Sequence, residues 1–339
     1  MKKILIFVFF LVYISCGSNN LVVDQNDTQI VTGDVAASFA NTITADDLKT
    51  HLYIIASDEF EGRNTGDSGQ KKAAEYLKNF YTSINIASPL GGDDYFQDIP
   101  TDYLKSNLNP SENVVAFIEG TENPDEIVIV SAHYDHVGMS DGEIYNGADD
   151  NGSGTVAVMK IAEAFQYAVE NGNGPKRSIL FLHVTGEEKG LLGSKFYVNF
   201  PIFPLENTVT NLNIDMIGRI DTAHKDNPNF VYVIGADKLS TELNDLSEKI
   251  NTTFTQLELD YTYNSDEDPN RFYYRSDHYN FAKNNIPIIF YFNGTHEDYH
   301  RPSDTPDKIN YEMLAKRTQL VFYTAWEVAN REKRVVVDK

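Results

Sequence analysis

Hydrophobic and polar positions first follow a helical period along the chain and later form uninterrupted apolar runs. After Thr44, a residue typical of helix N-termini, Leu48, Leu52 and Ile55 recur at i, i+4 and i+7 and predict a helix. Residues 68–83 repeat this period and predict a second helix. Apolar runs predict strands at residues 112–119, 126–132, 178–184, 209–214, 230–234 and 286–292.

Helical patterns separate these predicted strands, at residues 153–169, 240–250 and 310–328 and in a short segment from Lys189. Continuous apolar strands between helices predict an α/β fold, with a doubly wound, mostly parallel central sheet and helices on both faces. Neither an internal repeat nor a Pro/Gly linker divides residues 43–333, which predicts one domain followed by a tail at 334–339.

The N-terminus has the pattern of an export signal. Lys2 and Lys3 precede an apolar run at 4–14, which as a helix spans only about 16 Å against about 30 Å of hydrocarbon. We therefore expect residues 1–15 to be removed. Cys16, the only cysteine, stands where the lipobox of bacterial lipoproteins has its acylated cysteine, although Tyr13 replaces the usual leucine.

Residues 16–42 lack apolar periodicity and are interpreted as a lipid-anchored flexible tether. The expected location is therefore the bacterial cell envelope, at the outer membrane or facing the periplasm, rather than free secretion. A net charge of -22 argues against nucleic acid as a partner and against docking on anionic lipid by charge. We expect membrane attachment through the N-terminal lipid alone.

Side chains of the kind that bind metals follow four of the predicted strands. Because the carboxyl ends of parallel strands meet at one edge of a sheet, these groups are expected to lie together. A further acidic pair, Asp149 and Asp150, directly precedes a predicted helix. The residues after the strands are His133, Asp135, Glu187, Glu188, Asp215 and His300.

Nitrogen and oxygen ligands without thiolates suit zinc, cobalt or manganese. Two histidines with three carboxylates carry more negative charge than one zinc site needs, whereas two metals about 3.5–4 Å apart that share a carboxylate would balance it. Hydrolysis of an amide would then need one further group, a base for the attacking water.

Seven segments together resemble the M28 zinc peptidases, a group that includes di-zinc aminopeptidases and glutaminyl cyclases. The resemblance covers roughly residues 44–330 and implies the doubly wound α/β fold predicted above. The segments are ASDEFEGRNTG, SAHYDHVG, NGADDNGSGT, TGEEKGLLGS, NIDMIGR, RSDHYNF and EDYHRPSDTPDKI.

The resemblance implies a role for each matching residue. One metal would be bound by His133, Asp150 and Asp215, and the other by Asp150, Glu188 and His300, with Asp150 as the bridge. Glu187 matches the general base, and Tyr299 matches a donor of a hydrogen bond to the tetrahedral intermediate.

The remaining polar residues of these segments are interpreted as supporting groups. Asp135 is expected to orient His133, a role that metal-binding histidines commonly require. Asp149 is expected to be a turn or cap residue for the helix that begins near Ser153. Ser276, Asp277 and His278 are expected around the ligands. The other histidines near the motifs, His136, His183 and His296, are not expected to bind metal.

The predicted function is a zinc metallopeptidase with two Zn²⁺ per chain that releases N-terminal amino acids from peptides. The first alternative is a glutaminyl-peptide cyclotransferase of the same fold with one zinc, and the second is a non-catalytic binding module. About fifteen residues separate Gln97 from the strand near Asn113, too few for a protease-associated domain. Residues 260–271 are either a solvated insertion or a rim that selects the substrate.

Overall fold

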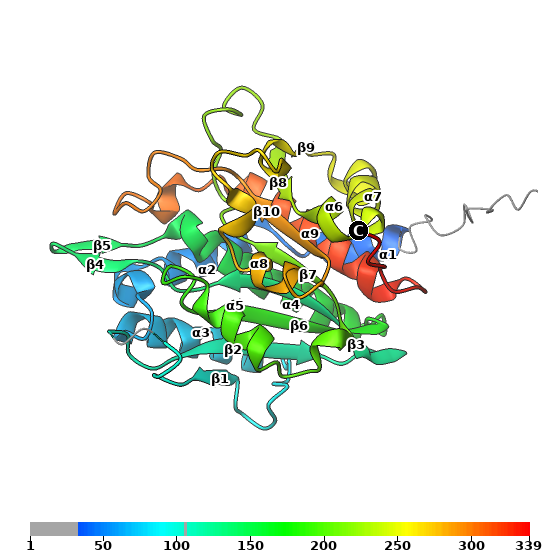
Figure 1. The fold of residues 1–339 in the computed structure, drawn as a ribbon, viewed down its shortest axis with the longest axis horizontal. Coiled ribbons are helices and arrows are strands. Elements are labelled where there is room, and N and C mark those ends of the chain that lie inside the picture. Colours follow the sequence, from blue (N-terminus) through cyan, green and yellow to red (C-terminus); the bar gives the residue numbers. More distant parts are fainter. Residues whose placement is uncertain (1–32, 105–106) are drawn as a thin grey trace, which may run out of the picture.

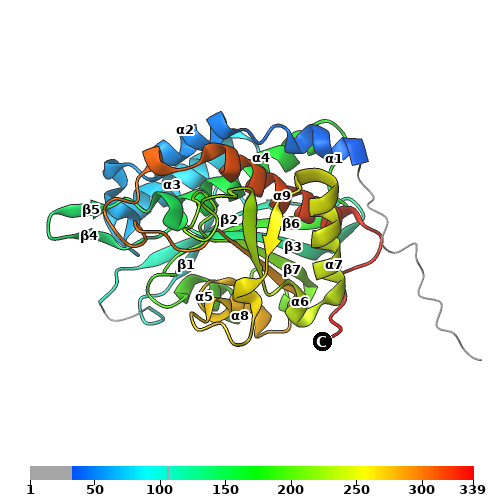
Figure 2. The ribbon, with the colours of Figure 1, turned by 90° about the horizontal axis from the view of Figure 1, so that it is seen from above.

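The computed structural model describes residues 33–104 and 107–339, and its centre is an eight-stranded sheet between two layers of helices (Figures 1 and 2). In the order in which they pair, the strands are β1 (Phe96–Ile99), β2 (Ser111–Ile118), β6 (Arg177–Val184), β3 (Asn123–His133), β7 (Thr208–Ile214), β10 (Ile288–Phe292), β8 (Phe230–Ile234) and β9 (Glu258–Asp260).

The four central strands β6, β3, β7 and β10 run parallel to one another. Every residue of β6, β7 and β10 is buried, which is typical of strands covered on both faces. The predicted α/β sheet is therefore confirmed. Strands β2 and β8 pair antiparallel with the edges of this central group. Their direction was not predictable, because β2 and β8 are as apolar as the central strands.

Helices cover both faces of the sheet (Figure 2). The helices predicted at 68–83, 153–169, 240–250 and 310–328 correspond within two residues to α3 (Ser68–Ser83), α4 (Gly154–Glu170), α7 (Thr241–Ile250) and α9 (Tyr311–Asn330). The short helix expected from Lys189 begins at Leu192. One layer holds α1 (Gly33–Ala40), α2 (Ala45–Ile55), α3 (Ser68–Ser83), α4 (Gly154–Glu170), α7 (Thr241–Ile250) and α9 (Tyr311–Asn330), and the other holds α5 (Leu192–Asn199) and α8 (His278–Ala282), with α6 (Ala236–Leu239) beside β10.

The expected tether is wrong for residues 33–42, because helix α1 is part of the domain. Phe39 is 4% exposed, and its ring packs against Tyr167 of α4 and Trp326 of α9, at centroid distances of 5.8 and 5.4 Å. The apolar residues of this short helix were too few to show a period in the sequence. Cys16 and the predicted signal lie outside the described residues.

The predicted tail at 334–339 also contacts the domain. Val335 is buried, and the Arg334 guanidinium donates to the carbonyl oxygens of Glu206 and Thr208. In the part of the chain that the structure describes, no helix has the length and apolar character that crossing a bilayer requires.

A small hairpin, β4 (Gly138–Ser140) and β5 (Glu143–Tyr145), projects from the end of the molecule where the central strands terminate (Figure 1). Three-residue strands carry no recognisable hydrophobic period, so the sequence did not predict this hairpin. Its base contacts the segment around Gly62, which brings the ASDEFEGRNTG motif close to the carboxyl end of β3.

Candidate metal centre and active site

The predicted ligands come together where the parallel strands end. His133 is the last residue of β3, Asp215 directly follows β7, and Glu188 follows β6 after a short turn. His300 lies in the loop after β10, and Asp150 precedes α4. This arrangement is the one expected from the shared direction of the four strands.

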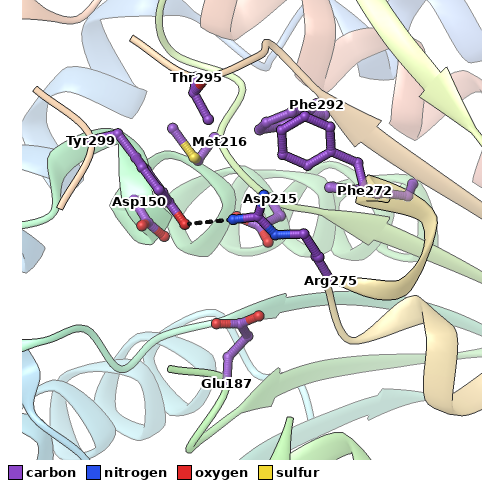
Figure 3. Close-up of a pocket in the computed structure, with 10 residues that line it drawn as sticks. Asp150, Glu187, Asp215, Met216, Phe272, Arg275, Phe292, Thr295 and Tyr299 are labelled. Carbon is purple, nitrogen blue, oxygen red and sulfur yellow. Dashed lines mark hydrogen bonds between the residues drawn. The ribbon is translucent and has the colours of Figure 1, made fainter. Parts of the chain in front are cut away.

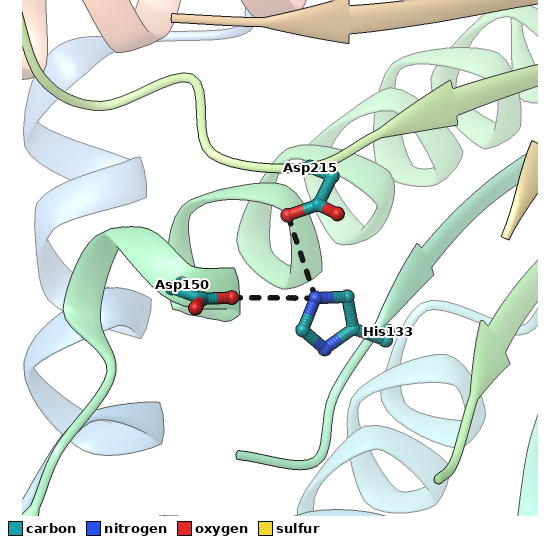
Figure 4. Close-up of side chains that lie close together, drawn as sticks. All are labelled: His133, Asp150 and Asp215. Carbon is teal, nitrogen blue, oxygen red and sulfur yellow. Dashed lines mark ion pairs between the residues drawn. The ribbon is translucent and has the colours of Figure 1, made fainter. Parts of the chain in front are cut away.

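The first group consists of His133, Asp150 and Asp215, which are all buried (Figure 4). His133 Nε2 lies 3.4 Å from Asp150 Oδ1 and 3.4 Å from Asp215 Oδ1. The other ring nitrogen, Nδ1, is 3.1 Å from the backbone oxygen of Asp135, which directs Nε2 toward the acids. Burial opposes protonation of His133, but the carboxylates of Asp215 and Asp150 raise its pKa well above the ordinary value.

The second group shares Asp150 with the first and adds Glu188, His136 and His300. Asp150 Oδ2 is 3.0 Å from His300 Nε2, and Glu188 Oε1 is 3.1 Å from the same nitrogen. Glu188 Oε1 also lies 3.0 Å from His136 Nδ1. Asp150 therefore presents one oxygen to each group, as a bridging carboxylate does.

His136 is a correction to the sequence interpretation, which treated it as structural. It forms a possible metal-binding group with Asp150 and Glu188, and its side chain is fully buried. Its position three residues after His133 was visible in SAHYDHVG. What the sequence did not reveal is that the chain after β3 turns toward the end of β6 and so faces Glu188.

The residues of both groups fit divalent metal ions. Among the described residues, His133 Nε2, Asp150 Oδ2 and Glu188 Oε1 are buried side-chain atoms with no well-aligned hydrogen-bond partner. Buried polar atoms are almost always satisfied, so such a cluster points to a bound group. Imidazole nitrogens and carboxylate oxygens without thiolates suit zinc, cobalt or manganese.

Glu187 belongs to neither group. Its carboxylate faces a hollow that also exposes Asp150, Asp215 and Tyr299, and it lies across that hollow from them (Figure 3). Its backbone N–H donates to Asp135 Oδ1 at 3.1 Å. Burial raises the pKa of the Glu187 carboxyl well above its ordinary value, and the charge of Asp215 raises it further. A carboxyl with a raised pKa can accept and release a proton near neutral pH.

Asp135 supports both sides of the site. Its backbone oxygen is close to His133, as described, while its carboxylate oxygens accept from Glu187 N and from Thr65 Oγ1, the latter at 2.8 Å. The expected support of His133 therefore comes mainly from the backbone oxygen, because the carboxylate is 3.8 Å from Nδ1. The Asp135 carboxylate instead fixes the backbone that carries Glu187.

The Asp149 side chain does not cap α4, but the residue lies in the turn before that helix, which was the other expected role. Its carboxylate accepts from Gly218 N at 2.7 Å and Asn293 Nδ2 at 3.0 Å, and lies 3.1 Å from His296 Nε2. Asn151 instead makes the side-chain hydrogen bond at the start of α4, where its Oδ1 accepts from Gly154 N. Asp149 thus connects the loops that follow β7 and β10, contacts too distant in sequence to be predicted.

The three residues expected from RSDHYNF differ in their distance from the ligands. Ser276 Oγ donates to Asp215 Oδ2 at 2.7 Å and so holds a proposed ligand. Asp277 is buried behind the site, where burial raises its pKa to about 7, and it accepts from Ser194 Oγ. His278 contacts the Tyr273 carbonyl and stacks on Phe290, so its described contacts do not reach the ligands.

Two buried charged residues that the sequence analysis did not assign hold the ligand loops. The Arg63 guanidinium donates to the carbonyl oxygens of Ile55, Tyr134, Asn146 and Gly147. It therefore ties the chain after β3 to the chain before α4.

Asp304 makes the second of these connections. Its carboxylate accepts from the backbone N–H groups of Asp149 and Asp150, at 3.0 and 3.1 Å, and its backbone oxygen accepts from Ala148 N. Because Asp304 lies four residues after His300, it joins the two loops that carry Asp150 and His300.

The hollow beside the ligands is small and has an apolar wall. Tyr299 and Arg275 lie at its rim, with Arg275 Nη2 3.5 Å from the Tyr299 hydroxyl (Figure 3). The apolar wall consists of Met216, Phe272, Phe290 and Phe292.

Residues 260–271 were interpreted as either a solvated insertion or a rim that selects the substrate. Part of this segment packs against the apolar wall. Tyr263 packs against Phe272 and Phe292, at centroid distances of 4.7 and 6.2 Å. Asp268 is buried, and its Oδ2 accepts from Phe272 N at 2.9 Å. Part of the segment is thus packed beneath the hollow rather than solvated.

Comparison with known proteins identifies the family of the chain. The profile of Peptidase family M28 matches residues 113–325. Leucine aminopeptidase 2 of Trichophyton rubrum is 29% identical over 244 residues, 65% of this chain and 45% of the relative. The chain thus spans less than half the length of that curated relative.

Solved structures share the fold at low sequence identity. The zinc aminopeptidase BSAP of Bacillus subtilis superposes with a TM-score of 0.66 and 17% identity, over 87% of this chain and 98% of that one. A glutaminyl cyclase of Porphyromonas gingivalis gives a TM-score of 0.62 and 16% identity, over 83% and 97% of the two chains.

Proposed function

Since the chain belongs to peptidase family M28, we propose that it is a zinc-dependent exopeptidase that releases N-terminal amino acids from peptides. The observation that carries this proposal is the position of Asp150, whose two carboxylate oxygens face His133 on one side and His300 on the other. The name of the relative from T. rubrum, a leucine aminopeptidase, supports peptides with a free N-terminus as substrates.

The geometry supports two metal-binding sets. His133, Asp150 and Asp215 would bind one zinc ion, and Asp150, Glu188 and His300 the other, with His136 beside the second set. Bound zinc would supply Lewis acidity toward the scissile carbonyl and lower the pKa of a water molecule. Cobalt or manganese would also suit these ligands.

The residues of the chain account for the movement of protons. Glu187 takes a proton from the attacking water as the water oxygen bonds to the carbonyl carbon. The same carboxyl delivers that proton to the amine nitrogen as the carbon–nitrogen bond breaks. The Tyr299 hydroxyl donates a hydrogen bond to the carbonyl oxygen as that oxygen gains negative charge.

Substitution of the two adjacent glutamates tests this division of roles. We expect Glu187→Gln to lower kcat by about 10²- to 10⁴-fold while the zinc content stays at the wild-type value. Glu188→Gln, the matched control, should lower both the zinc content and the activity. Full residual activity of Glu187→Gln on aminoacyl chromogenic substrates would contradict the assigned base.

A second candidate function is glutaminyl-peptide cyclisation with one zinc, favoured by the shared fold of the P. gingivalis cyclase. The two reactions give different products from a peptide that begins with glutamine. Hydrolysis releases free glutamine, whereas cyclisation leaves a pyroglutamyl peptide and releases ammonia. Mass spectrometry of the products with the purified, zinc-loaded protein distinguishes them, and the absence of both would favour a non-catalytic binding module.

We also propose that the protein is exported and anchored to the cell envelope by a lipid on Cys16. The support is the charged, apolar and small-residue pattern of the first seventeen residues. Labelled fatty acid should be incorporated into the wild-type protein and not into Cys16→Ser. Equal labelling of the two proteins would contradict the proposal.

A further inference from the structure

Arg275 is an exposed cation at the rim of the hollow, whose lining consists mainly of acidic and apolar side chains. The chain has 28 lysine and arginine residues and 50 acidic residues, and three of the acids, Asp150, Glu187 and Asp215, line this hollow. Among the residues that the structure describes, no carboxylate forms an ion pair with Arg275. Its contacts are instead with two aromatic side chains.

These contacts position the guanidinium and leave most of its donors available. The Arg275 Cζ atom lies 4.8 Å from the centre of the Phe272 ring. The Phe272 backbone is held in turn by the buried carboxylate of Asp268. A guanidinium has five N–H donors, and the described contacts use one of them, in a long hydrogen bond to the Tyr299 hydroxyl.

The position of Arg275 relates it to the proposed chemistry. Tyr299 is the proposed donor to the scissile carbonyl, so a group bound by Arg275 would lie within a side chain's length of that bond. The apolar wall, which includes Met216 and Phe292, would contact the methylene carbons that carry such a group (Figure 3). The hollow therefore suits a short apolar stem that ends in an anion.

We propose that Arg275 binds a substrate carboxylate and selects peptides with a negative charge next to the scissile bond. This inference rests on the proposed peptidase function. An arginine fork at the rim of the hollow provides a planar, bidentate partner for such an anionic group. The carboxylate is either the side chain of an N-terminal aspartate or glutamate, or the terminal carboxylate of a dipeptide.

Matched substrate pairs test the proposal. One pair carries an N-terminal glutamate or glutamine, and the other is a dipeptide or its C-terminal amide. For Arg275→Gln we expect kcat/KM on the carboxylate member of one pair to fall about 10- to 100-fold more than on its neutral partner. Arg275→Lys should show a smaller difference, because lysine keeps the charge and loses the fork. The pair that shows the difference identifies the source of the carboxylate.

Arg271→Gln is the matched control. Arg271 lies four residues away, and its guanidinium packs over the Tyr274 ring at 4.7 Å, outside the hollow. The control should change the ratio within each pair by less than about twofold. The proposal would be overturned if Arg275→Gln lost the same factor in kcat/KM on both members of both pairs. It would also be overturned if kcat/KM did not fall at all, because either result excludes recognition of a carboxylate.

A binding measurement separates this proposal from the peptidase function. Free glutamate should raise the melting temperature of the wild-type protein more than free glutamine, and this difference should disappear in Arg275→Gln. If the wild-type protein cleaves no substrate but still binds glutamate through Arg275, the result contradicts the peptidase function alone. Cleavage with no dependence on Arg275 would contradict only the role of Arg275.

Discussion

At the scale of single residues, the two adjacent glutamates have different surroundings although they share the same turn. Glu188 is near His136 and His300, while Glu187 faces the hollow and its backbone is held by Asp135. Adjacent carboxylates repel each other in a low-dielectric site, so this turn is stable only with compensating charge. The histidines, and the metal ions that the site fits, provide it.

Asp304 gives the first prediction at this scale, because it holds Asp150 from behind through two backbone N–H groups. Asp304→Asn replaces a carboxylate, which only accepts hydrogen bonds, by an amide whose NH₂ group donates them. We expect zinc affinity to fall about 10- to 100-fold, as is typical for residues that orient ligands. Competition with a chromophoric chelator measures this affinity. Asp307→Asn, an exposed position nearby, is the control, and equal affinities in the two variants would contradict the role of Asp304.

At the scale of elements, the sequence predicted the long strands and helices and missed the short ones. Apolar runs located β3, β6, β7 and β10 because both faces of each strand are covered, and helical periods located α3 and α9. The hairpin β4–β5 and strand β9 have three residues each, too few to show a period.

The candidate site was also predicted only in part. The predicted ligands followed from the ends of strands together with the motifs. The contacts of Arg63 with Tyr134 and Gly147 join positions 71 and 84 residues apart, and no local pattern predicts them. His136 was missed for the same reason, because its partner Glu188 lies in the turn after a different strand, β6.

Helix α1 gives a prediction at the scale of elements. Phe39 is its main contact with the domain, so Phe39→Ala should lower the free energy of unfolding by about 3 kcal/mol, through lost burial and the cavity that remains. Urea unfolding measures the change. Val35→Ala in the same helix, at a side chain that is 47% exposed, should change stability by less than about 0.5 kcal/mol. Equal effects at both positions would show that α1 is not packed as described.

At the scale of the whole molecule, two buried histidines couple folding to pH. His183 in β6 contacts the Tyr81 hydroxyl at 2.7 Å, and His278 in α8 stacks on Phe290. Burial lowers the pKa of each imidazole to about 3, from an ordinary value near 6.5. Between these two values the unfolded chain binds more protons than the folded chain. The contribution of each neutral histidine is therefore complete above about pH 6.5 and is lost as the pH falls toward 3.

The expected slope is about 1.4 kcal/mol per pH unit for each histidine, so unfolding free energies measured in urea should fall steeply between about pH 6.5 and 5. His183→Gln should lower this slope by about 1.4 kcal/mol per pH unit. Tyr81→Phe, the control, removes the hydrogen bond but keeps the titrating group, so its stability should shift without a change of slope.

All samples in this measurement should contain excess EDTA, because proton competition for the histidine ligands would otherwise add zinc release to the pH dependence. The metal ligands then titrate alike in every variant, and the difference between variants isolates His183. Curves of wild type and His183→Gln that run parallel from pH 7.5 to 5 would mean that His183 is protonated equally in both states. That result would contradict its burial as a neutral side chain between β6 and α3, and with it the close packing of this helical layer on the sheet.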